Sequence, residues 1–143
     1  MDPAELFSAG AAPSATDMLG AEWQVTMLSG PIPNMSGRPL RHRKVFEQRT
    51  SVVGCNIMLK DWRWGQFRAL PSIGSDGRPI LLLDYYGNFF EPANSFVTRQ
   101  IRDHLRTTPD PNAMIGKFHI VWRGKPRFVG YFELSRCHRS TNR

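Results

Sequence analysis

A chain of 143 residues with 41% hydrophobic residues is long enough for one domain with a single core and too apolar to be disordered. No uncharged apolar run approaches the roughly 18 residues of a membrane span, and residues 1–17 lack the basic and apolar regions of a secretory signal, so we expect a cytoplasmic protein with no membrane partner. The formal net charge of +7 attracts polyanions, but the basic residues are scattered among apolar ones, which makes nucleic acid an unlikely partner.

Residues 1–17 are rich in Ala, Pro and Ser and are predicted to form a flexible arm, with a helical turn near Ala4 to Phe7. The folded domain is expected over residues 18–143. Apolar runs, alternating or nearly continuous, predict strands at residues 23–28, 40–48, 52–59, 62–70 and 80–86. Gly54 indicates a bulge within its strand. The turn-rich segment 29–39 is long enough to be a lid or flap.

One amphipathic helix is predicted over residues 96–106, because Val97, Ile101 and Leu105 repeat every four residues after a capping Asn94 or Ser95. Residues 114–136 alternate with period two on both sides of Gly124-Lys125, which is typical of a β-hairpin with a tight turn. A hairpin with so many aromatic residues needs further strands to cover it.

Seven strands linked mostly by short connections favour a mainly β, single antiparallel meander, with the one short helix before the last two strands. Such a meander forms either a sandwich or an up-and-down barrel. We expect the barrel, because closure removes the two edges that the aromatic strands would otherwise expose.

The segment Gly20-Ala21-Glu22-Trp23 at the first strand, together with Arg136 after the last, resembles the calycin superfamily of lipocalin-like barrels. In these proteins a glycine and a tryptophan open the barrel and a late arginine covers the tryptophan. The spacing here is Gly-x-x-Trp, one residue longer than the lipocalin pattern. The resemblance implies a central cavity for an apolar small molecule and, in some members, a non-redox isomerisation or cyclisation.

Polar residues on strands with apolar neighbours are the candidate catalytic groups. Asp84 shares a face with Ile80 and Leu82, so an interior position would desolvate its carboxyl. His119 and Tyr131 lie in the last hairpin and could move a proton. A turn or strand-end carboxylate paired with Arg43 or Arg99 is the alternative for Asp84, and a solvated face is the alternative for His119. The candidate ligand-binding residues are Arg43, Asn56, Trp64, Tyr86, Phe118, Trp122 and Phe132.

Neither a metal-binding motif nor a phosphate-binding loop occurs in the sequence, so we expect neither a metal nor a cofactor. The favoured function is the binding of an apolar or aromatic small molecule, with a cofactor-free isomerisation or cyclisation of a natural-product-like substrate. A ligand carrier without catalysis and a single-stranded nucleic-acid-binding module are the alternatives. Residues 31–37 and 88–94 are expected to form a flap over one end of the barrel, and a homodimer through Phe89 and Phe90 is the alternative.

Overall fold

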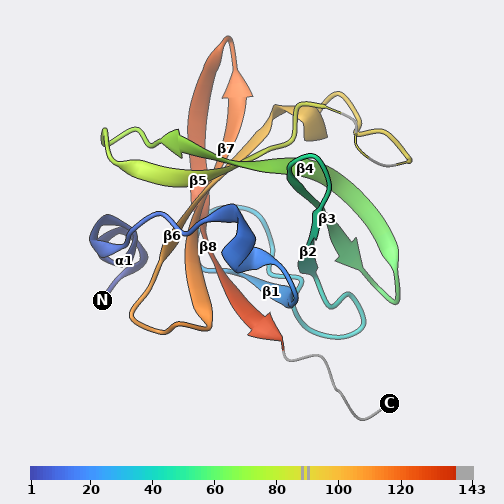
Figure 1. Cartoon of the computed structure of the whole chain (residues 1–143), viewed down its shortest axis with the longest axis horizontal. Coiled ribbons are helices and arrows are strands. Elements are labelled where there is room, and N and C mark those ends of the chain that lie inside the picture. The colour runs from blue at the N-terminus through green and yellow to red at the C-terminus, as the bar shows by residue number, and fades with distance from the viewer. Residues whose placement is uncertain (88, 90, 138–143) are drawn as a thin grey trace.

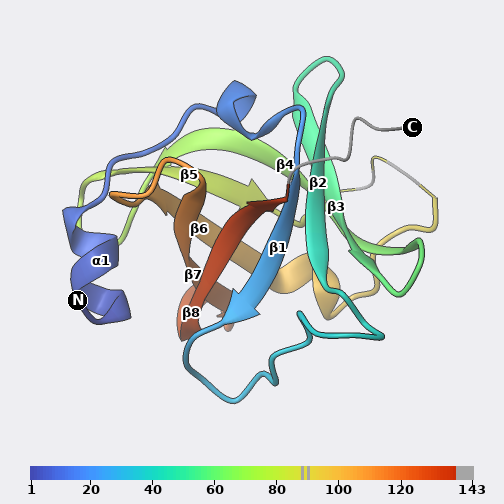
Figure 2. The ribbon, with the colours of Figure 1, turned by 90° about the horizontal axis from the view of Figure 1, so that it is seen from below.

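The computed structural model describes residues 1–87, 89 and 91–137, and eight of its strands form one closed antiparallel barrel in chain order (Figures 1 and 2). The mainly β barrel is therefore confirmed. Closure is made by β1 and β8, which pair from Glu22↔Cys137 to Met27↔Phe132. The strands are β1 (Glu22–Met27), β2 (Arg43–Gln48), β3 (Val52–Met58), β4 (Trp62–Ile73), β5 (Pro79–Asp84), β6 (Ile101–Thr107), β7 (Ala113–Trp122) and β8 (Lys125–Cys137).

The eighth strand, β6, replaces the helix predicted over residues 96–106. Only the one-turn 3-10 helix η2 (Thr98–Gln100) forms there, where the Ser95 hydroxyl accepts a hydrogen bond from Thr98 N. The spacing of four that suggested a helix is also a multiple of two, so Ile101 and Leu105 share one face of a strand with Asp103 between them. Pairing of β6 with β5 and β7 supplies the backbone hydrogen bonds that a helix would have made internally.

The up-and-down order divides the connections between two ends of the barrel. The connections β1–β2, β3–β4, β5–β6 and β7–β8 lie at one end, which we call the front end. The N-terminal segment and the connections β2–β3, β4–β5 and β6–β7 lie at the other, the back end (Figure 2). The tip of the β7–β8 hairpin projects well beyond the body of the barrel (Figure 1).

Apolar side chains fill the back half of the interior. Trp23, Phe67, Leu81, Leu105 and Leu134 are completely buried there. On β5 the inward face is Leu81, Leu83 and Tyr85, so the face that carries Asp84 points out of the barrel. Periodicity could not settle this orientation, because apolar residues occupy both faces of β5. The bend or bulge expected at Gly54 falls instead on the neighbouring strand: Gly54 pairs with Phe67 and Asn56 with Trp64, so the extra residue lies in β4.

The N-terminal segment packs on the barrel and is not the free arm expected over residues 1–17. Helix α1 (Pro3–Ala9) begins after Asp2, whose side chain accepts a hydrogen bond from Glu5 N at 2.9 Å, and Gly10 ends it. The helical turn predicted near Ala4 to Phe7 is thereby confirmed. Residues 15–18 add the 3-10 helix η1 (Ala15–Met18), which places Met18 in the core.

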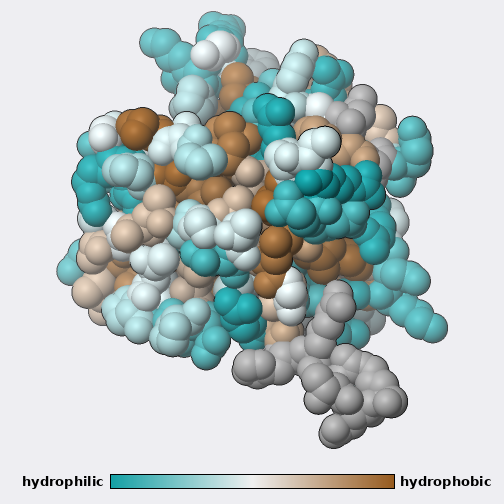
Figure 3. Space-filling view, viewed as in Figure 1, coloured by the Kyte–Doolittle hydropathy of each residue, from teal (hydrophilic) through white to brown (hydrophobic). Residues whose placement is uncertain are grey.

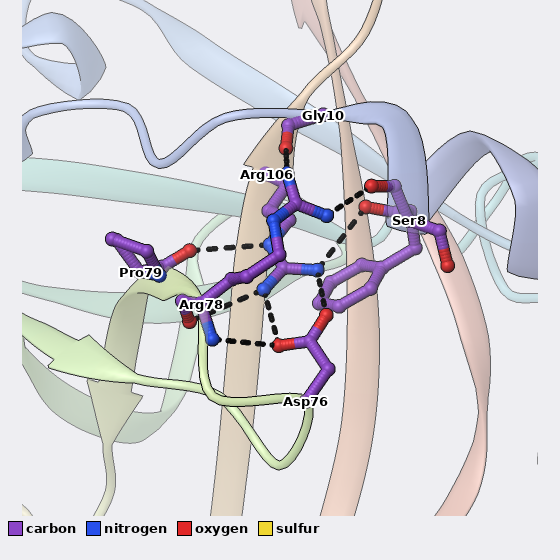
Figure 4. Close-up of polar contacts among 7 residues, drawn as sticks. Ser8, Gly10, Asp76, Arg78, Pro79 and Arg106 are labelled. Atoms are coloured by element: carbon purple, nitrogen blue, oxygen red, sulfur yellow. Dashed lines mark hydrogen bonds and ion pairs between the residues drawn. The ribbon is translucent and has the colours of Figure 1, made fainter.

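Two arginines hold α1 in place (Figure 4). The fully buried Arg106 guanidinium donates to both carboxylate oxygens of Asp76 at 2.7 Å, donates to Phe7 O at 3.3 Å, and lies 4.3 Å from the centre of the Phe7 ring. Arg78 donates to Ser8 O and, at 2.9 Å, to Gly10 O. Apolar burial and ionic hydrogen bonds therefore fix the same segment.

On the face seen in Figure 3, hydrophobic and hydrophilic side chains alternate in small patches. Within residues 1–87, 89 and 91–137, no helix has the length and apolar character needed to cross a membrane.

Candidate active site

The front half of the barrel interior contains a cavity of about 50 Å³. By volume this holds about four water-sized groups, so a ligand of a few non-hydrogen atoms fits without rearrangement. Ile32 and Met35 from the β1–β2 connection close its front. The remaining lining side chains are Val25, Met27, His42, Lys44, Asn56, Trp64, Asp103, Phe118 and Phe132.

A buried ion pair between Lys44 and Asp103 occupies one side of this cavity. Lys44 Nζ lies 3.3 Å from Asp103 Oδ2, and the two residues are 4% and 1% exposed. The Lys44 ammonium also donates to Asn56 Oδ1 at 2.8 Å and to the Tyr85 hydroxyl at 2.6 Å. Tyr85 in turn donates to Asp103 Oδ2 at 3.0 Å. All three hydrogens of the ammonium therefore have acceptors, as a buried charge requires.

Asn56 determines the tautomer of His42. Its amide nitrogen donates to Gly65 O at 3.0 Å, so its Oδ1 faces Lys44 and also lies 2.8 Å from His42 Nε2. Because Oδ1 can only accept, His42 Nε2 must carry the proton, and Nδ1 keeps its lone pair.

Three of the side chains that line the cavity have a buried polar atom without a hydrogen-bond partner. These atoms are Asp103 Oδ1 and His42 Nδ1, which accept hydrogen bonds, and Trp64 Nε1, which donates. Buried polar groups are nearly always paired, so unpaired ones beside a cavity indicate a site whose partner is a ligand. The ligand chemistry that matches is a mainly apolar molecule with one group that both donates and accepts.

Burial is the main cause of the pKa shifts in this network. It lowers the pKa of Lys44 and raises the pKa of Asp103, and the attraction between the two groups opposes both shifts. Burial also raises the pKa of Tyr85 well above its usual value. For His42, burial and the charge of Lys44 lower the pKa to about 4, so the imidazole is neutral at pH 7. The lowered pKa of Lys44 and the raised pKa of Asp103 make a proton easier to exchange near neutral pH than it would be between isolated groups.

Comparison of the chain with protein-family models, with curated proteins and with solved structures found no match. The contact expected from the calycin resemblance is nevertheless present. The Arg136 guanidinium lies 4.5 Å from the centre of the Trp23 ring, and Trp23 Nε1 donates to Met18 O at 3.0 Å.

Four of the ten predicted site residues line the cavity, namely Asn56, Trp64, Phe118 and Phe132. Arg43 lies outside the barrel, where it contacts Glu22 at 3.2 Å and donates to Lys60 O at 2.8 Å. Asp84 is also outside the barrel and forms an ion pair, as its alternative expected, but the partner is Arg102 at 3.3 Å and neither Arg43 nor Arg99.

The other four predicted residues also lie away from the cavity. Tyr86 and Trp122 are exposed at the front end. His119 is on the outer face of β7, where its ring lies 4.2 Å from that of His104 on β6, and it is 4% exposed, so its face is not solvated. Tyr131 points outward from β8 toward Phe7 and Phe128.

Sequence reasoning missed the four polar residues at the centre of the site, which are His42, Lys44, Tyr85 and Asp103. His42 and Lys44 share a face of β2 with the apolar Phe46, and that face could have been taken as inward. Tyr85 was missed because the opposite face of β5 was favoured. Asp103 was missed because its segment was assigned to a helix.

The structure places the first half of the predicted flap, residues 31–37, at the cavity, through Ile32 and Met35. In the second half, residues 88 and 90 lie outside the described residues. Asn94 pins that connection to the barrel by donating to Gln66 O and Tyr85 O at 2.8 Å. Across the described part of the chain, no three His, Cys, Asp or Glu side chains are grouped as a metal site would need.

Proposed function

We propose that the barrel binds a small, mainly apolar molecule that carries a carbonyl or hydroxyl group, and that it catalyses a cofactor-free proton transfer on that molecule. The observation that carries the proposal is the buried network of Lys44, Asp103, Tyr85 and Asn56 on one side of an otherwise apolar cavity, with Asp103 Oδ1 unpaired. A keto–enol isomerisation, or a cyclisation through the same enolate, is the reaction class that suits it.

Each group has a role in this reaction. Asp103 Oδ1 accepts the proton from the carbon beside the carbonyl, because it is a buried acceptor with a raised pKa and no other partner. The electron pair of that C–H bond moves to the carbonyl oxygen and forms an enolate. The charge of Lys44 and the unpaired Trp64 N–H stabilise this oxyanion in a site of low polarity. Asp103 then returns the proton to the enolate oxygen, which gives the enol, or to the same carbon, which exchanges its hydrogen without a net reaction.

The size of the cavity limits the substrate. A ligand of more than a few non-hydrogen atoms, cyclohexanone included, must displace Ile32 and Met35, which belong to a connection and not to a strand. A natural-product-like substrate therefore requires the β1–β2 connection to open. The proposal retains membership of the calycin superfamily, which the Arg136–Trp23 contact supports, and a cytoplasmic location.

The test is hydrogen–deuterium exchange at the carbons beside the carbonyl of cyclohexanone, followed by NMR in D₂O with catalytic protein. The wild type should accelerate exchange over buffer, and Asp103→Asn should reduce this acceleration about 100-fold or more. Asp84→Asn is the matched control, because that carboxylate lies outside the barrel, and it should retain the wild-type rate.

Asp103→Asn leaves Lys44 as a buried charge without its ionic partner, which costs about 3–5 kcal/mol. The variant with both Lys44→Met and Asp103→Asn removes both charges, and it serves as the folded inactive protein if the single variant is unstable. Wild-type exchange no faster than buffer, with cyclohexanone shown to bind, would leave only the carrier function. Native mass spectrometry of the purified protein identifies both a ligand retained from the cell and the predicted homodimer.

A further inference from the structure

Large exposed apolar side chains are concentrated at the front end of the barrel. Of the ten such residues among those described, only Met1 and Ile73 lie elsewhere. The other eight are Leu28, Leu59, Trp62, Tyr86, Phe96, Val97, Trp122 and Phe128. They come from all four front connections or the strand ends beside them. Single exposed apolar residues are ordinary, but eight around one end of a barrel indicate an interaction surface.

Two surface pockets join four of these residues, Trp62, Phe96, Val97 and Trp122, to the front of the cavity. Trp64 lines the cavity together with Ile32 and Met35, and it also lines an outer pocket with Trp62 and residues 92–95. Phe96 and Val97 line the next pocket with residues 120–124 of the β7–β8 hairpin. The surface therefore extends from the β1–β2 connection across the front end to the hairpin tip. We call it the front surface.

Charge is divided between the two ends in the same way. The front segments 28–42, 59–63, 85–100 and 122–128 contain seven exposed basic and two exposed acidic side chains, a net charge of +5 among the described residues. The basic ones are Arg38, Arg41, Lys60, Arg63, Arg123, Lys125 and Arg127, and the acidic ones are Asp61 and Glu91.

The back segments 1–21, 47–51, 74–78 and 108–112 contain two exposed basic and six exposed acidic side chains, a net charge of −4 over the same described part of the chain. The basic ones are Arg49 and Arg78, and the acidic ones are Asp2, Glu5, Asp17, Glu47, Asp76 and Asp110. Of the two ends, the front therefore carries the excess of exposed basic side chains.

We propose that the front surface docks on an anionic lipid bilayer, with its aromatic side chains in the headgroup region and its basic side chains against the headgroup phosphates and carboxylates. Exposed Trp and Tyr favour that region, and each Lys or Arg near an anionic surface adds attraction. Docking of this kind needs no spanning helix, so it is compatible with the absence of such a helix from the described residues.

The shape of the front surface favours a bilayer over a single nucleic-acid strand. A bilayer can take up exposed side chains from several front connections at once, including those of the projecting β7–β8 hairpin, whereas a strand follows a linear groove. Three of the eight apolar residues, Leu28, Leu59 and Val97, have no ring on which a base could stack. The residues that close the cavity, Ile32 and Met35, lie at the same end, so displacement of the β1–β2 connection would let an apolar ligand enter from the bilayer. That last step rests on the proposed function, but docking itself does not.

The experiment is co-sedimentation of the protein with vesicles of phosphatidylcholine alone and of phosphatidylcholine with about 30% phosphatidylserine, at about 0.1 M salt. Binding is expected only with phosphatidylserine. The variant with Arg123→Glu and Lys125→Glu should have an affinity for these vesicles that is lower by about tenfold or more. The single variant Arg123→Glu should also bind less. Its matched control is Arg68→Glu, which makes the same change in charge on the outer face of β4, away from the front surface, and should bind as the wild type does.

Lipids with brominated acyl chains give a second measurement, because they quench tryptophans that enter the bilayer. Quenching should decrease when Trp62 and Trp122 are both replaced by Phe, since Trp23 is completely buried. Equal loss of binding in the front and control variants would overturn the proposal. A failure to bind the anionic vesicles would also overturn it. In that case, tight binding to a single-stranded oligonucleotide, or a dimer that covers Trp122, would identify what the front surface contacts instead. Asp103→Asn leaves vesicle binding unchanged, which separates this test from that of the reaction.

Discussion

At the scale of single residues, the stacked pair His104 and His119 makes stability depend on pH. Their rings lie 4.2 Å apart between β6 and β7, and both side chains are buried. Burial is the main cause that lowers the pKa of His104 to about 3 and also lowers that of His119. At His104, His119 and the charge of Lys117 lower the pKa further, and Asp76 opposes the shift. At His119, Asp103 opposes the shift.

Below pH about 6.5 the unfolded chain therefore binds more protons at these histidines than the folded chain does. The contribution of these histidines to the free energy of unfolding is therefore fully present above that pH. It falls as the pH decreases toward their lower pKa values in the folded state, by up to about 1.4 kcal/mol per pH unit for each histidine. Urea unfolding between pH 6.5 and 4.5 should show this slope, and the variant with His104→Gln and His119→Gln should have a smaller one. The remaining slope comes partly from His42, whose pKa is also lowered. An unchanged slope in the double variant would contradict the assignment.

At the scale of elements, the N-terminal helix α1 is held by a small cluster of its own. Phe7 packs with Ile80 and Ile115 on the outside of the barrel, separately from the interior core. Arg106 and Arg78 bind the backbone of the same segment (Figure 4). The segment can therefore detach while the barrel stays closed, because none of the eight strands pairs through it.

Phe7→Ala should lower the free energy of detaching α1 from the barrel by about 3 kcal/mol. It should increase amide hydrogen exchange over residues 3–11 by about 100-fold, with little change in the strands. Ala4→Gly is the control, because Ala4 is exposed in the same helix, and it should raise exchange by a smaller factor. Equal acceleration in α1 and in β6 would instead mean that the helix and the barrel unfold together.

At the scale of the whole molecule, the front end is where the barrel can change shape. The back half of the interior is filled by core side chains, and the cavity is closed in front by Ile32 and Met35 of a connection without secondary structure. Binding of cyclohexanone should therefore slow hydrogen exchange in residues 30–37 and leave the β4–β5 turn at the back end unchanged. Protection in both regions would show that the ligand tightens the whole barrel and does not act at the β1–β2 connection.

The sequence by itself determined the class of fold. Apolar patterns in the β7–β8 hairpin and in all five earlier runs predicted strands where the structure has them. The need to cover aromatic edges predicted closure of the barrel. It also identified part of the cavity, because Asn56, Trp64, Phe118 and Phe132 line it. Residues 101–107 were not decided in this way, because a spacing of four fits a helix and a strand equally well.

Only the tertiary structure decided which residues form the site. Lys44, Asn56 and Asp103 come from three different strands and Tyr85 directly follows a fourth, and no local pattern relates them. The inward face of β5 follows from closure of the barrel, since its apolar residues lie on both faces. The division of charge between the front and back ends likewise appears only when the alternating connections are assembled at opposite ends. Along the chain the same charges are scattered, because successive connections lie at opposite ends of an up-and-down barrel.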